Sequence, residues 1–142
     1  MKNQPLIRRD TPQWIFQTWA SFGIALGLTV CGAFALPAGS LDMAFMAMGM
    51  FFSIFSTLAL SKMLRDNHHE PVDVHSWRFA VWGAFGIAVS LTTWGIMRLQ
   101  CSDWQRAFLA GSCLFLLSAT FTLAKTLRDR HEADLLDSRS EP

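Results

Sequence analysis

The sequence predicts an all-α, polytopic membrane protein whose four transmembrane helices form two tandem parallel helical-hairpin repeats in a pseudo-two-fold bundle. Composition is the first support, because 51% of the 142 residues are hydrophobic and only 16% are charged. A soluble domain carries about 25% charged residues. The second support is a set of long uncharged segments, and the third is a repeat that covers most of the chain.

Clusters of charged residues delimit the apolar segments. A helix that crosses a bilayer core needs about 20 apolar residues, and each gap between clusters supplies roughly that length. The gaps run from Asp10 to Asp42, from Asp42 to Lys62, from Arg78 to Arg98, and from Arg106 to Lys125. Because backbone groups in hydrocarbon must be paired within their own segment, each gap is predicted to be a helix. Tight turns are expected at residues 37–40 and 99–103.

An ungapped shift of 63 residues superimposes the second half of the chain on the first. Trp14, Trp19, Phe22 and Gly23 then match Trp77, Trp82, Phe85 and Gly86. Each unit holds an even number of spans, so both units enter the membrane in the same sense, related by rotation about the membrane normal. The predicted organisation is a cytoplasmic tail (1–13), a first repeat (14–68), a linker (69–76), a second repeat (77–131) and a tail (132–142), which is disordered or a short frayed helix.

The distribution of basic residues predicts the orientation. Ten of the twelve Lys and Arg residues fall on the side that holds both termini and the central linker. Only Arg98 and Arg106 fall on the other side. Under the positive-inside rule, both termini and the linker are therefore expected in the cytoplasm.

The two tandem units resemble a known family. Each unit opens with Trp and Gly and closes on Lys62-x-x-Arg65-Asp66 or Lys125-x-x-Arg128-Asp129. They are similar to the YiaA/YiaB two-helix-domain family of bacterial inner-membrane proteins, over roughly residues 14–131. The resemblance implies a small multi-pass protein of the bacterial inner membrane, in a family without an assigned catalytic activity or a defined ligand. The chain departs from the family's pattern at the outer turns and contains no Tyr.

The repeated basic endings form the first candidate site, a lipid- or partner-docking rim. Its residues are Lys62, Arg65, Asp66, Lys125, Arg128 and Asp129. One interpretation is structural, because cations at the C-terminus of a helix complement its dipole and meet anionic lipid headgroups. The other is a cytoplasmic docking surface for a protein partner. The sequence does not separate the two.

Small residues at helical spacing form the second candidate site, a helix-packing or lumen stripe. Its residues are Gly23, Gly27, Gly49, Ser53, Thr57, Gly86 and Ser90. Small residues let helix backbones approach closely in lipid, which favours packing. The alternative is a polar lining for a solute path.

Metal binding and catalysis find little support in the sequence. Thioethers bind Cu(I), so the cluster from Met43 to Met50 is a possible ligand set, as is the linker with His68, His69 and His75, and both are left open. No catalytic motif is recognisable, so we expect no enzyme activity and no cofactor. A net charge of +1 also argues against nucleic acid as a partner.

Two functions remain. The first is a non-enzymatic structural or accessory membrane protein whose basic rim contacts membrane lipid or an unidentified membrane-protein partner. The second is a small-solute or ion conduit formed by a homo-oligomer, in which Gly49, Ser53 and Thr57 of the stripe, together with Ser61, face a shared lumen. The oligomeric state is left open. Mid-bilayer positions carry no ionisable side chain, and such side chains usually mark ion pathways, so the first function is favoured.

Overall fold

The computed structural model describes residues 10–36, 39–67 and 74–140, and this part of the chain folds into long helices without a strand. The helices are α1 (Pro12–Phe34), α2 (Ser40–Asp66), α3 (His75–Arg98) and α4 (Asp103–Ser140). Each is long and apolar enough to cross a membrane. The predicted fold class, an all-α polytopic membrane protein, is confirmed.

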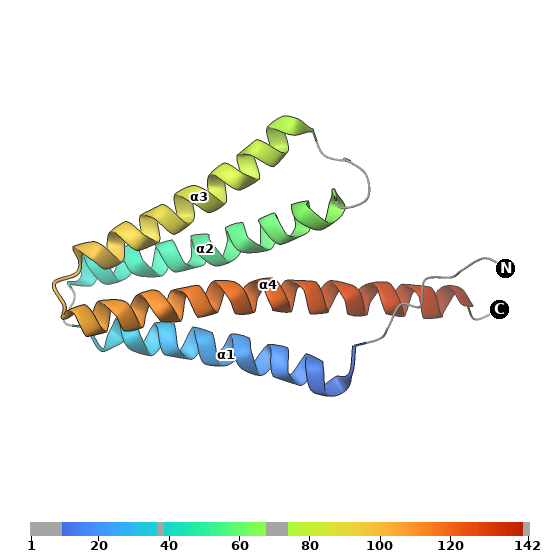
Figure 1. Ribbon diagram of the computed structural model, residues 1–142, viewed down its shortest axis with the longest axis horizontal. Coiled ribbons are helices and arrows are strands. Elements are labelled where there is room, and N and C mark those ends of the chain that lie inside the picture. Colours follow the sequence, from blue (N-terminus) through green and yellow to red (C-terminus); the bar gives the residue numbers. More distant parts are fainter. Residues whose placement is uncertain (1–9, 37–38, 68–73, 141–142) are drawn as a thin grey trace.

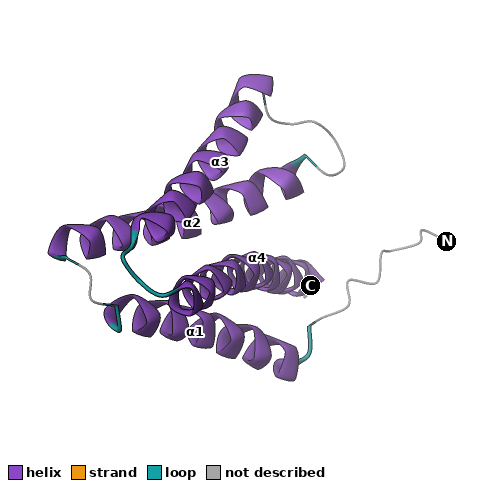
Figure 2. Ribbon diagram, turned by 60° about the vertical axis from the view of Figure 1, so that its left-hand side comes forward, coloured by secondary structure: helices purple, strands orange, loops and turns teal. Residues whose placement is uncertain are grey.

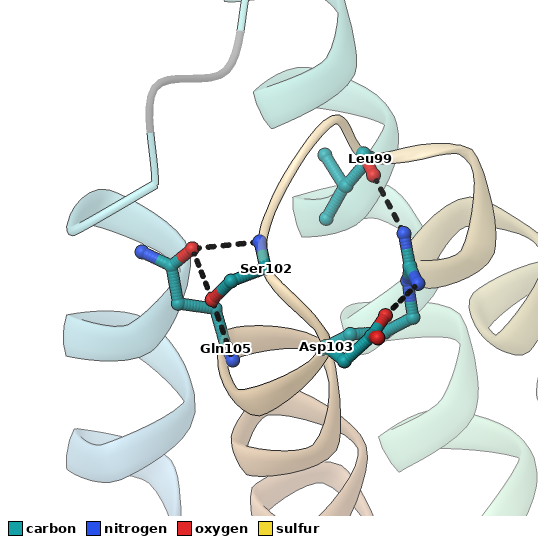
Figure 3. A network of polar contacts seen from close by, with 5 residues as sticks. Leu99, Ser102, Asp103 and Gln105 are labelled. Carbon is teal, nitrogen blue, oxygen red and sulfur yellow. Dashed lines mark hydrogen bonds and ion pairs between the residues drawn. The ribbon is translucent and has the colours of Figure 1, made fainter.

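Local sequence explains where two of the helices begin. Thr11 caps α1 by accepting a hydrogen bond from the Trp14 amide at 3.3 Å, and Pro12 occupies the first turn. At α4, Ser102 and Gln105 form a capping box: the Gln105 side chain accepts from the Ser102 amide at 3.0 Å, while Ser102 Oγ accepts from the Gln105 amide at 3.4 Å (Figure 3). The connection between α3 and α4 is therefore held in place by the side chains of Ser102 and Gln105.

The helices pair across the repeats. Helix α1 packs along α4, α2 packs along α3, and α2 and α4 meet in the centre (Figure 1). The two helices of one repeat are joined by a short connection but make few contacts with each other, as the separate α1/α4 and α2/α3 pairs in Figure 2 show. The first helix of each repeat therefore packs on the second helix of the other.

Equivalent contacts in the two pairs reveal the pseudo-two-fold symmetry. A β-carbon placed on Gly32 of α1 would lie 2.9 Å from the Phe108 ring of α4. A β-carbon on Gly95 of α3 would lie 3.0 Å from the Phe45 ring of α2. These residues are related by the repeat spacing, so the same close approach occurs twice.

The core is a column of three small clusters along α2 and α4. The cluster at the turn end, where α1 connects to α2 and α3 to α4, contains Leu36, Met46, Ile96, Leu99 and Leu109. Large apolar side chains on the outer surface, such as Phe16, Phe51 and Phe79, are each about three-quarters exposed. An apolar surface of this kind suits a lipid environment.

At the other end, α1 begins, α2 ends, α3 begins and α4 ends (Figure 1); we call this the terminal end. Helix α4 is the longest and continues to Ser140, so most of the predicted C-terminal tail is helical. The predicted linker contributes His75 and the following residue to α3. Residues 1–9 and 68–73 lie outside the described part of the chain.

Candidate functional site

The basic rim at the terminal end contains polar contacts between α2 and α4. Arg128 of α4 donates from Nη2 to Ser61 Oγ at 2.8 Å and from Nη1 to the Ser61 carbonyl oxygen at 3.2 Å. Arg65 of α2 forms an ion pair with Asp129 of α4 at 3.6 Å. We call Ser61, Arg65, Arg128 and Asp129 the inter-repeat clamp, because it joins the second helices of the two repeats.

The clamp is asymmetric although its arginines are repeat equivalents. Ser61 corresponds to Ala124, which has no side-chain acceptor. Arg65 therefore cannot make the hydroxyl contact that Arg128 makes, and it pairs with Asp129. The sequence pattern places Ser61 with the small-residue stripe, whereas the structure places it in the rim against Arg128. The difference between Ser61 and Ala124 in the repeat alignment is the signal for its rim contact.

Three rim residues lie outside the clamp with exposed side chains: Lys62, Asp66 and Lys125. Only the basic residues of the first copy of the motif, at the end of α2, can complement the dipole at the C-terminus of their helix. Helix α2 ends at Asp66, but α4 continues beyond Asp129 to Ser140, so Lys125 and Arg128 do not lie at the end of their helix. The rim thus combines a clamp within the bundle and lysines directed outward.

Three residues of the small-residue stripe lie inside the bundle, two of them in the α2/α3 contact. Ser53 Oγ lies 3.0 Å from Thr92 Oγ1 of α3, and a β-carbon on Gly49 would lie 3.1 Å from the same oxygen. Thr57 is fully buried and donates to the Ser53 carbonyl oxygen at 2.7 Å. Their polar groups are therefore satisfied by protein, and the structure places them inside the bundle of one chain.

The remaining stripe residues face outward. Gly23 and Gly27 of α1 and Gly86 and Ser90 of α3 are exposed. A β-carbon placed on any of these three glycines would meet no atom within 4 Å. The structure thus does not bring the two halves of the predicted stripe together, and its three outward glycines contribute no close helix contact among the described residues.

The methionines predicted as a metal cluster are distributed differently. Met46 and Met50 are buried in different core clusters, whereas Met48 is 71% exposed. His75 is exposed at the start of α3, and His68 and His69 lie outside the described residues. Within the described ranges, no group of three or more His, Cys, Asp or Glu residues could hold a metal ion.

Comparison with known proteins supports the repeat. A family model described as the yiaA/B two helix domain matches the chain twice, over residues 14–66 and 77–129. The two matches coincide with the two units related by the 63-residue shift. Comparison with curated proteins and with solved structures finds no match.

Proposed function

Because the chain belongs to the yiaA/B two helix domain family, we propose that it is a non-enzymatic accessory protein of the bacterial inner membrane whose cytoplasmic rim binds anionic lipid headgroups. The observation that carries the proposal is the arrangement at the terminal end. Lys62 and Lys125, equivalent residues of the two repeats, are both exposed beside the inter-repeat clamp. The bundle therefore presents two cations from a single braced surface.

Electrostatics favours lipid as the ligand of these lysines. A basic side chain near an anionic leaflet gains about 1 kcal/mol of binding free energy. The clamp supports lipid binding by the lysines. Arg128 and Arg65 are engaged with residues of the same chain across α2 and α4, whereas the lysine side chains are exposed. Trp14, whose indole donates to Thr126 Oγ1 at 3.2 Å, lies at the same end of the bundle.

The position of Trp14 provides a direct assay. In a variant that keeps Trp14 and carries Phe at the other five tryptophans, we expect phosphatidylglycerol with brominated acyl chains to quench the emission more strongly than brominated phosphatidylcholine. The double variant Lys62→Gln, Lys125→Gln should weaken this preference, because both exposed rim lysines are gone, although Arg78 and Arg130 remain exposed at the same end. Quenching in vesicles of each lipid is the measurement.

Arg98→Gln is the matched control, since Arg98 is also an exposed cation but lies at the turn end, over the Trp94 ring. It should retain the headgroup preference at Trp14. Equal quenching of Trp14 by both lipids, with Lys62 and Lys125 intact, would contradict the proposal. A lysine-dependent membrane-protein partner, recovered by crosslinking with no lipid preference, would point to protein docking instead.

A further inference from the structure

A groove of about 490 Å³ lies between α3 and α4, with α2 as its floor. Its lining is mainly apolar and includes Ile54 of α2, Val89 and Met97 of α3, and Leu114 and Leu117 of α4. The charged residues of its lining, Asp103 and Arg106, both come from the first turn of α4. The groove is therefore charged at the turn end and apolar farther in.

The depth of the groove matches one leaflet of a bilayer. Along α4 its lining extends from Asp103 to Leu117, which at 1.5 Å per residue corresponds to about 21 Å. A bilayer is about 40 to 45 Å thick with its headgroup regions, or about 20 to 22 Å per leaflet. The lining thus extends from the polar interface at the turn end to about the middle of the membrane.

Arg106 has a hydrogen-bond donor that is not used by protein. Its guanidinium donates from Nη1 to Asp103 Oδ1 at 3.0 Å and from Nη2 to the Leu99 carbonyl oxygen at 3.2 Å, the contacts drawn in Figure 3. Its Nε is buried, and no acceptor for it is found among the described residues. The buried Nε is closed to a ligand, but Nη1 and Nη2 each carry a second N–H, and the side chain is 32% exposed. A phosphate oxygen is the acceptor that such a guanidinium binds best.

The repeat shows that the fold does not require this arrangement. The residue equivalent to Arg106 is Met43, and the residues equivalent to Met97 and Leu114 are Phe34 and Phe51. The place between α1 and α2 therefore has no cation and has larger side chains at two lining positions. A cation at this position therefore occurs in only one of the two repeats, so the repeated fold does not require it.

We propose that this groove binds one glycerophospholipid from the leaflet at the turn end, with an acyl chain along the apolar walls and the phosphate on Arg106. The volume lies within the about 300 to 1,000 Å³ typical of ligand pockets. The Asp103 carboxylate is already engaged by Arg106 Nη1, so it reduces the positive charge. The Arg106 side chain is nevertheless 32% exposed, and its two Nη atoms carry further N–H donors for a phosphate. The site lies at the opposite end from the lysine rim and does not depend on the function proposed for that rim.

The test is native mass spectrometry of the full chain extracted from membranes in mild detergent. The wild-type protein should retain one phospholipid. Arg106→Met, which copies the residue of the first repeat, should lower the occupancy about tenfold or more, as expected for loss of a charge-assisted hydrogen bond. The double variant Met97→Phe, Leu114→Phe, which copies the bulkier equivalent residues, should lower it to a similar extent by filling the groove.

Arg98→Met is the matched control, because it removes a cation from the same end outside the groove lining, and it should leave the occupancy unchanged. Circular dichroism of every variant checks that the helices are intact. Unchanged lipid retention in the groove-filled variant would overturn the proposal, as would equal losses in the Arg98 and Arg106 variants. Titration with diacylglycerol separates the phosphate from the acyl chains: equal affinity for diacylglycerol and phospholipid would also overturn the role of Arg106.

Discussion

Individual residues in this bundle use small size and internal hydrogen bonding to bring helices together. Thr29 and Thr92, equivalent in the two repeats, each donate a hydroxyl to the carbonyl oxygen four residues earlier in the same helix, at 2.8 and 2.9 Å. Both side chains are buried. Because each helix satisfies its own hydroxyls, polar residues can occupy a contact between helices without water.

Glycine position decides whether a larger side chain is tolerated. We expect Gly95→Leu to destabilise the bundle by about 1 to 3 kcal/mol, the usual range for overpacking, because a β-carbon at Gly95 would already lie 3.0 Å from the Phe45 ring. Thermal unfolding in detergent measures the effect. Gly86→Leu, on the exposed side of the same helix, is the control. A melting temperature lowered equally by both substitutions would contradict this account of Gly95.

At the level of elements, the pairing of helices across the repeats is the main feature of the structure. The predicted hairpins have their short connections, but each helix finds its main partner in the other repeat. The inter-repeat clamp between α2 and α4 adds polar contacts at the terminal end. Separation of the two repeats would therefore break the α1/α4 and α2/α3 contacts at once.

Crosslinking tests this pairing. In a variant lacking the native cysteines, Ser53→Cys with Thr92→Cys should form a disulfide on mild oxidation, because the two hydroxyl oxygens are 3.0 Å apart across α2 and α3. Ser53→Cys with Thr29→Cys places one cysteine on each of the two helices of the first repeat, and this pair should remain unlinked. Mobility shift on a reducing and a non-reducing gel is the readout. Efficient linkage of the second pair alone would show that the helices pair within a repeat.

The whole molecule has a polarity that follows from its even number of spans. Helix α1 begins and α4 ends at the terminal end of the bundle (Figure 1). The same end carries the lysines and the inter-repeat clamp. Since ten of the twelve Lys and Arg residues fall on this side, the positive-inside rule predicts that it faces the cytoplasm.

Reporter fusions test the orientation in cells. A reporter that is active only in the cytoplasm should be active when fused after Pro142. A reporter that is active only outside should be active when inserted at Gly39, in the connection at the turn end. Opposite activities would reverse the proposed topology, and cytoplasmic activity at both positions would mean that the first pair of helices does not cross the membrane.

The candidate sites were only partly predictable from the sequence. The rim residues share a motif, so their common position at one end follows from the repeat. The division of the rim into clamp and exposed lysines depends on Ser61, which approaches Arg128 only when α2 and α4 pack together. The groove at Arg106 could not be predicted from the sequence, because residues of three helices form it. In the sequence, Arg106 is only one of several charged residues near a predicted turn.

The number of spans, the duplication and the membrane environment were determined by the sequence alone, because chain length, apolar composition and the exclusion of charge from hydrocarbon act locally along the chain. The choice of partner for each helix was decided only in the tertiary structure. A repeat predicts equivalent contacts, but it is equally compatible with pairing within a unit or between units. Side-chain shape at positions such as Gly32 against Phe108, and Gly95 against Phe45, selects pairing between units, because van der Waals fit is what drives association between helices in lipid.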